Sequence, residues 1–127
     1  MDMFRGFRLI AEWRRKRDER LWADFESMRA NVAARGAHIA DVETIRQKAR
    51  TGTKAYVRWL DTGEVDAVWA RARRLSKGQM LALSGRRGYG EHHDEPVFYI
   101  DRAGPRVDRR TYSGWARHEA RRVGGAG

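Results

Sequence analysis

The chain has 127 residues, enough for one domain or for one domain with an arm. It contains no cysteine, which excludes disulfides and thiolate zinc sites. Its longest apolar runs, of about four residues, are far too short to span a bilayer, and its N-terminus has no apolar segment of the kind that directs secretion. We therefore expect no membrane partner and a cytoplasmic location, or a place within an intracellularly assembled particle.

The formal net charge of +10 comes from 27 basic and 17 acidic residues. Residues 1–50 and 105–127 each carry a net charge of +4, whereas residues 51–104 carry +2. A basic excess of this size favours polyanionic partners, chiefly nucleic acid. However, 23 of the basic residues are Arg and only 4 are Lys, and an excess of Arg beside abundant Ala and Gly also results from GC-rich coding. Composition therefore indicates nucleic acid without requiring it.

Apolar residues recur at helical spacing over the first part of the chain. A first stripe has spacings of three and consists of Phe4, Phe7, Ile10 and Trp13. After the charged residues 14–20, a second stripe has spacings of four, three and four, typical of a coiled coil or helical hairpin; it consists of Leu21, Phe25, Met28 and Val32. We expect residues 1–50 to form a helical interaction arm whose apolar stripe docks on the rest of the chain or on another copy.

Gly36 lies in the middle of this arm. Glycine is costly inside a helix and common just after a helix end, which favours a turn at residues 35–38 and a second helix over residues 39–50. The alternative is one long helix that continues through Gly36 and pairs with another chain.

After residue 51 the apolar residues alternate, as they do in strands. Gly63 lies in a turn sequence between two such runs and can take the positive φ that a hairpin needs. Strands are expected at residues 54–60, 65–70, 79–84, 97–100 and 106–109, with a loop at 85–95 and a basic helix at 113–123. Residues 65–76 also fit helical spacing, so a helix there is the alternative.

These elements predict an α+β protein. The helical arm at residues 1–50, one long helix or a helical hairpin, is followed over residues 51–127 by a small antiparallel β-barrel or rolled sheet and a short C-terminal helix. The layout of the strands resembles that of SH3-like small barrels, although no family motif is present. Such a resemblance concerns the fold and does not by itself indicate a function.

The best candidate for catalysis or metal binding is the run His92-His93-Asp94-Glu95. These residue types bind divalent metals and act as acid/base pairs. Adjacent side chains in an extended segment point to opposite sides, however, and no further ligand follows at helical spacing. Because no nucleophile motif accompanies them, we predict no catalytic residue, no metal site, no cofactor and no enzyme activity.

Two Arg-rich segments are candidates for contact with nucleic acid. Residues 85–90 combine flexible Gly, Arg for phosphate and Tyr for base stacking. In the closing helix, Arg117 and Arg121 lie one turn apart and repel each other unless an anion lies alongside. The candidate contact residues are Arg58, Arg86, Arg87, Tyr89, Arg109, Arg110, Arg117 and Arg121.

The sequence therefore predicts a non-enzymatic, nucleic-acid-binding accessory protein that contacts phosphate through its Arg-rich segments. The alternative is a structural or assembly protein of a large complex, such as a virion component, in which the helical arm makes the protein–protein contacts. Either function is compatible with a homo-oligomer or a larger assembly.

Overall fold

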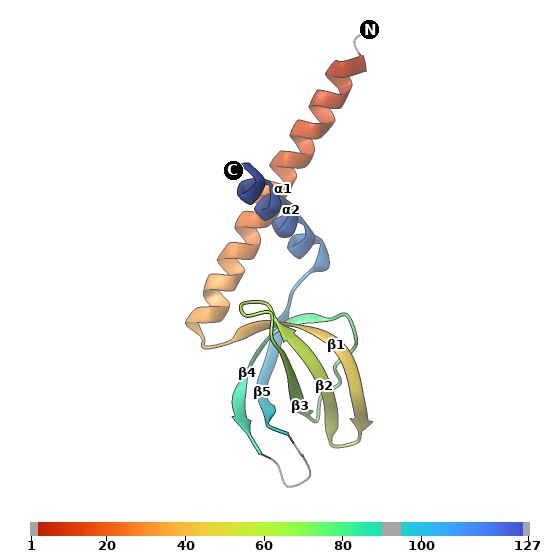
Figure 1. Ribbon diagram of the computed structural model, residues 1–127, viewed down its shortest axis with the longest axis vertical. Coiled ribbons are helices and arrows are strands. Elements are labelled where there is room, and N and C mark those ends of the chain that lie inside the picture. Colours follow the sequence, from red (N-terminus) through yellow and green to blue (C-terminus); the bar gives the residue numbers. More distant parts are fainter. Residues whose placement is uncertain (1–2, 90–94, 126–127) are drawn as a thin grey trace. The chain divides into compact units, whose positions relative to one another are not determined.

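The computed structural model describes residues 3–89 and 95–125 (Figure 1). It confirms the predicted class, because a long N-terminal helix precedes a closed five-stranded barrel and a short C-terminal helix ends the fold. The chain divides into two compact units, Met1–Ala30 with Asp108–Gly127, and Asn31–Val107. The elements are α1 (Met3–Ala34), β1 (His38–Ala49), β2 (Gly52–Trp59), β3 (Val65–Arg71), β4 (Met80–Gly88), β5 (Val97–Arg106) and α2 (Arg109–Gly125).

Helix α1 ends at Ala34 and Gly36 lies in the turn that follows, as the first of the two interpretations predicts. Gly36 has a φ of 72°, and its N–H donates to the carbonyl of Ala33 at 2.9 Å. The N–H of Ala37 donates to the carbonyl of Val32 at 3.1 Å, so the last carbonyls of the helix are satisfied by a glycine cap.

The predicted second helix over residues 39–50 is wrong, because β1 occupies these residues. The register with β2 shifts between Val42 and Thr44 and again between Ile45 and Gln47, and each shift marks a bulge. A bulge adds one residue to a strand, so inward-facing side chains can be three apart instead of two. Ile45 packs on the same core as Val42 for this reason, and the resulting spacing mimics that of a helix.

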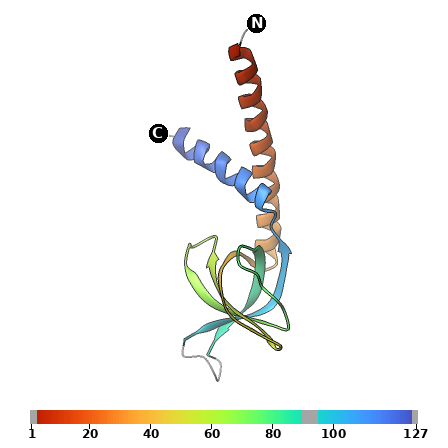
Figure 2. The same ribbon diagram turned by 90° about the vertical axis from the view of Figure 1, so that its right-hand side faces the viewer.

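The strands close into a barrel in the order β1-β2-β3-β5-β4 (Figure 2). Neighbours are antiparallel, as predicted, except that β5 lies beside β3 and runs parallel to it. Strand β1 pairs with β4 through its first residues and with β2 along most of its length. The closed barrel of five strands confirms the predicted small barrel. Its strand order, with a parallel β3–β5 pair, resembles that of the OB-fold, a five-stranded Greek-key barrel.

Three other predictions about the barrel differ from the observed strands. The helical alternative for residues 65–76 is wrong, because β3 covers most of that range. Strand β4 continues to Gly88 and takes up the first part of the predicted loop at 85–95. The predicted strands at 97–100 and 106–109 are replaced by a single strand, β5, which absorbs the predicted turn between them.

The unit that contains α2 is a pair of crossed helices. Leu21 of α1 packs against Gly114 of α2, and Phe25 contacts the rings of Tyr112 and Trp115 at centroid distances of 5.9 and 4.9 Å. Part of the apolar stripe of the arm is thus covered by the chain's own C-terminal helix. Neither α1 nor α2, the helices of the described residues, is long and apolar enough to cross a bilayer.

Two reciprocal Trp–Glu contacts join the two helices. Trp22 of α1 donates its indole N–H to Glu119 of α2 at 2.6 Å, and Trp115 of α2 donates to Glu26 of α1 at 2.8 Å. In each case the residue three positions after the Glu is an Arg that pairs with it and lies over the bonded Trp ring. Both indole N–H groups and both carboxylates of these contacts therefore have polar partners across or along the helices.

Gly114 permits the close approach of the two helices. A Cβ at this position would lie 2.6 Å from Leu21 Cβ, which cannot move without the helix backbone. We expect Gly114→Ala to lower the free energy of unfolding by about 1–2 kcal/mol, because overpacking outweighs the gain of about 1 kcal/mol in helix propensity. Urea unfolding followed by far-UV circular dichroism measures this.

The matched control is Gly6→Ala on α1, where a Cβ would meet nothing within 4 Å. This variant is expected to be slightly more stable than the wild type, because only the propensity gain acts. Equal effects of the two substitutions would contradict the packing of α2 on α1.

Candidate nucleic-acid interface

A row of aromatic and basic side chains crosses four strands of the barrel on its outer face. Lys54 of β2 is the register partner of Trp69 of β3, Trp69 is the partner of Tyr99 of β5, and Tyr99 is the partner of Arg86 of β4. Register partners lie on the same face of a sheet. We call Lys54, Trp69, Tyr99 and Arg86 the aromatic row.

The buried neighbours of Trp69 identify this face as the outer face of the barrel. Trp69 lies between Val68 and Ala70, which are fully buried in the barrel core. Because side chains alternate along a strand, Trp69 lies on the opposite, outer face. Lys54, Trp69 and Tyr99 are each half-buried and Arg86 is exposed, so the row forms part of the barrel surface.

Tyr56 extends the row along β2, two residues after Lys54. The guanidinium of Arg46 lies over its ring at 5.5 Å, and its hydroxyl donates to the Glu95 carboxylate at 2.8 Å. This hydrogen bond is the main cause that raises the pKa of Tyr56 above its ordinary value, with burial adding to it. Glu95 also lies 3.9 Å from the ammonium of Lys54, so the chain's own carboxylate neutralises part of this basic surface.

Four predicted contact residues lie on the barrel, and two of them are already paired. Arg58 donates to Glu43 at 2.5 Å and to the carbonyl of Gly63 at 2.6 Å. Arg87 is bound to the carboxylate of Asp66, which also accepts the indole N–H of Trp59 at 2.9 Å. Arg86 is in the aromatic row, and Tyr89 follows the end of β4 with 80% of its surface exposed.

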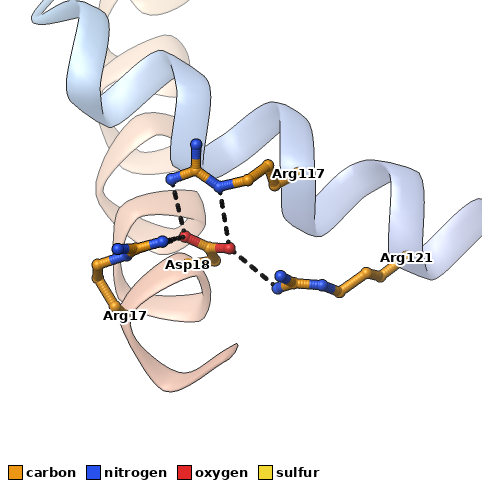
Figure 3. A network of polar contacts seen from close by, with 4 residues as sticks. All are labelled: Arg17, Asp18, Arg117 and Arg121. Atoms are coloured by element: carbon orange, nitrogen blue, oxygen red, sulfur yellow. Dashed lines mark hydrogen bonds and ion pairs between the residues drawn. The ribbon is translucent and has the colours of Figure 1, made fainter. Parts of the chain in front are cut away.

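The other four predicted contact residues lie on α2, and two of them bind one buried carboxylate (Figure 3). Arg117 holds both oxygens of Asp18 through a two-pronged contact at 3.0 and 3.1 Å, and Arg121 binds Oδ2 at 3.0 Å. Arg17 adds a third guanidinium at 3.1 Å. The anion that the spacing of Arg117 and Arg121 calls for is therefore supplied by α1 of the same chain.

The electrostatics of this cluster follow from its geometry. The Asp18 side chain has no exposed surface, yet its hydrogen bonds to Arg117 lower its pKa to about 2 against the opposing effect of burial. The same contact raises the pKa of Arg117. Arg109 and Arg110 begin α2 and are exposed, and the N–H of Arg110 donates to Asp108 at 3.1 Å, which caps the helix.

The predicted arm residues are divided between the two units. Leu21 and Phe25 pack on α2, and Phe25 is fully buried. Met28 is half-buried on the same helix, and Val32 is buried in the last turn of α1, which belongs to the barrel unit.

The barrel also carries a pocket of about 310 Å³ beside Trp59, with the rings of His38 and Phe98 on its walls. Asp61 also lines this pocket, and its Oδ2 lies 3.5 Å from Nδ1 of His38. Across residues 3–89 and 95–125, no three His, Asp or Glu side chains gather as a metal site requires. Of the run His92-His93-Asp94-Glu95, only Glu95 falls among the described residues.

Sequence reasoning missed Lys54, Tyr56, Trp69 and Tyr99 as site residues. Strand alternation places Tyr56 and Trp69 on one face of the first hairpin, so this part of the signal is local. The pairing of β3 with β5, which brings Tyr99 beside Trp69, joins residues far apart in the chain and leaves no local pattern. Comparison with protein-family models, with curated proteins and with solved structures gave no match to this chain.

Proposed function

We propose that this protein is a non-enzymatic accessory protein that binds single-stranded nucleic acid on the outer face of its barrel. The observation that supports this most is the aromatic row, in which Trp69 and Tyr99 are neighbours and Lys54 and Arg86 flank them. The proposal includes a cytoplasmic location, which the lack of cysteine favours.

The chemistry of the row suits a single strand. Neighbouring strands of a sheet lie about 4.8 Å apart, so the two aromatic residues are close enough to hold adjacent bases by stacking. The basic residues on either side then lie where the phosphates of such a strand pass. A duplex hides the faces of its bases, so single-stranded nucleic acid is the expected partner.

The architecture of the barrel also favours nucleic-acid binding, by analogy with OB-fold barrels. OB-fold barrels bind oligonucleotides on the face formed by strands 2 and 3, and Lys54, Tyr56 and Trp69 lie on that face here. One fold hosts many functions, so the proposal rests on the side chains of the aromatic row.

The first test is fluorescence anisotropy with labelled single-stranded and duplex probes over a range of salt. We expect Trp69→Ala to weaken single-strand binding by about 5- to 100-fold, the effect of about 1–3 kcal/mol per stacked base, and Trp69→Phe to retain most of the affinity. Lys77→Gln, an exposed charge in the β3–β4 loop, is the control for lost charge and is expected to change affinity little.

Glu95→Gln is expected to change the affinity for the single strand in the opposite direction. Removing this carboxylate from Lys54 is expected to tighten binding, a result that a merely unfolded protein would not give. If Trp69→Ala binds as the wild type does, or if neither probe binds at low salt, the proposal fails.

The alternative, an assembly protein that uses its helical arm, is favoured by one observation. Phe7, Ile10 and Trp13 form a stripe on α1 with 69%, 50% and 57% of their surfaces exposed. Light scattering at low and high salt distinguishes the two functions. A defined oligomer without nucleic acid at both salts favours assembly, whereas a species that sheds nucleic acid at high salt favours binding.

A further inference from the structure

The barrel contains a second basic feature that is separate from the aromatic row. A pocket of about 250 Å³ lies where β3 ends and β4 and β5 meet, and Arg73, Arg74 and Arg106 line it together with Leu75 and Gln79. No lining residue is acidic. Three arginines that line one pocket bring like charges together, and a bound anion would offset their repulsion.

The described part of the chain offers these arginines little internal charge compensation. Arg73 donates to the carbonyl of Ala103 at 3.0 Å, which fixes its side chain without neutralising it. Arg74 and Arg106 are exposed, and no carboxylate of residues 3–89 or 95–125 lies within ion-pair distance of either. This differs from Arg58, Arg87 and Arg117, each of which binds a carboxylate.

The backbone that presents Arg73 and Arg74 is held in place. Ala72 has a φ of 55°, a left-handed conformation that a residue with a Cβ rarely adopts. Its N–H donates to the carbonyl of Thr51 at 2.7 Å, and the hydroxyl of Thr53 donates to the carbonyl of Arg73 at 2.8 Å. Backbone strain of this kind is found at sites where the chain must aim particular groups.

We propose that this pocket binds a phosphate group. A guanidinium presents several N–H donors in a planar fork, and three of them match an anion with several oxygens and two charges better than they match a carboxylate. The phosphate comes either from a small phosphorylated molecule or from the backbone of a strand that lies on the aromatic row. The pocket does not depend on the row, so it stands even if the proposed function fails.

The test is a titration of the full-length protein with inorganic phosphate, at ionic strength held constant with chloride and with acetate as the carboxylate control. We expect the double variant Arg74→Gln, Arg106→Gln to lose at least tenfold in phosphate affinity. Arg102→Gln, an exposed charge on the same strand as Arg106 that does not line the pocket, is expected to lose less than twofold.

A second experiment identifies the source of the phosphate. In it, inorganic phosphate competes with a labelled single strand for binding to the protein. Competition that the double variant abolishes assigns the pocket to a backbone phosphate. Phosphate binding with no effect on the single strand assigns it to a small phosphorylated molecule. Equal phosphate affinity in the wild type, the double variant and Arg102→Gln, or no saturable binding at all, overturns the proposal.

Discussion

Replacing Gly85 with alanine is expected to lower the free energy of unfolding of the barrel by at least about 3 kcal/mol, at the upper end of the usual cost of overpacking. A Cβ at this position would overlap the carbonyl oxygen of Tyr99 and lie 2.9 Å from its carbonyl carbon and 3.0 Å from Ile100 Cα. All three are backbone atoms, so β4 and β5 would have to separate. The register between them already shifts between Ser84 and Gly85, where the strand bends.

Gly88→Ala on the same strand is the matched control. Its nearest neighbour would be the Tyr99 ring at 3.9 Å, an ordinary contact, so its effect is expected to stay below about 1 kcal/mol. Urea unfolding followed by tryptophan fluorescence compares the two variants. Failure of Gly85→Ala to fold, with Gly88→Ala folded, also supports the close approach, whereas equal midpoints would contradict it.

Replacing Asp18 with asparagine is expected to weaken the pairing of α1 and α2 by about 2–3 kcal/mol. Removing one partner of a buried ion pair usually costs about 3–5 kcal/mol. Here the cost is expected at or just below the lower end of that range, because Arg117 and Arg121 are each about half exposed and can turn to solvent. The measurement is amide hydrogen exchange in α2, where protection is expected to fall roughly 30- to 150-fold. Glu12→Gln, which removes an exposed pair with Lys16 on the same helix, is expected to change it little.

The Asp18 carboxylate also makes the stability of the folded state depend on pH, and its lowered pKa fixes the sign of this dependence. The pKa of Asp18 is lowered to about 2, so its charged form stabilises the folded state above the ordinary carboxyl value near pH 4. This contribution, about 1–2 kcal/mol after screening by solvent around the arginines, is lost as the pH falls from about 4 to 2. Asp18→Asn is expected to lack this part of the acid transition. An unchanged acid transition in that variant would contradict the role of Asp18.

Local signals determined what could be predicted of the fold. The end of α1 just before Gly36 and the turn at Gly63, whose φ is 73°, follow from the conformational freedom of glycine. Residues 39–50 were expected to be helical. The bulge between Val42 and Thr44 gives β1 a three-residue spacing from Val42 to Ile45 on its inner face, and a bulge depends on the partner strand. The place of β5 between β3 and β4 is likewise a property of the closed barrel.

In the candidate site, too, local features could be predicted from the sequence and long-range contacts could not. The need of Arg117 and Arg121 for an anion could be predicted from their spacing, but its source, Asp18, lies almost a hundred residues away. Arg86 was predicted from its Gly-rich surroundings, whereas its neighbours in the aromatic row required the register of four strands. Charge composition alone did not separate arginines that hold the fold together from those that remain open to a ligand.

The most direct test of the central claim is a two-dimensional NMR titration of isotope-labelled protein with a short oligothymidine at low salt. Each of the five tryptophans gives its own indole N–H signal. We expect the Trp69 signal to move most, and the signals of Trp22 and Trp115, which are hydrogen-bonded within the helix pair, to stay in place. Shifts confined to Trp22 and Trp115, or an unchanged Trp69 signal at saturating oligonucleotide, would contradict the claim.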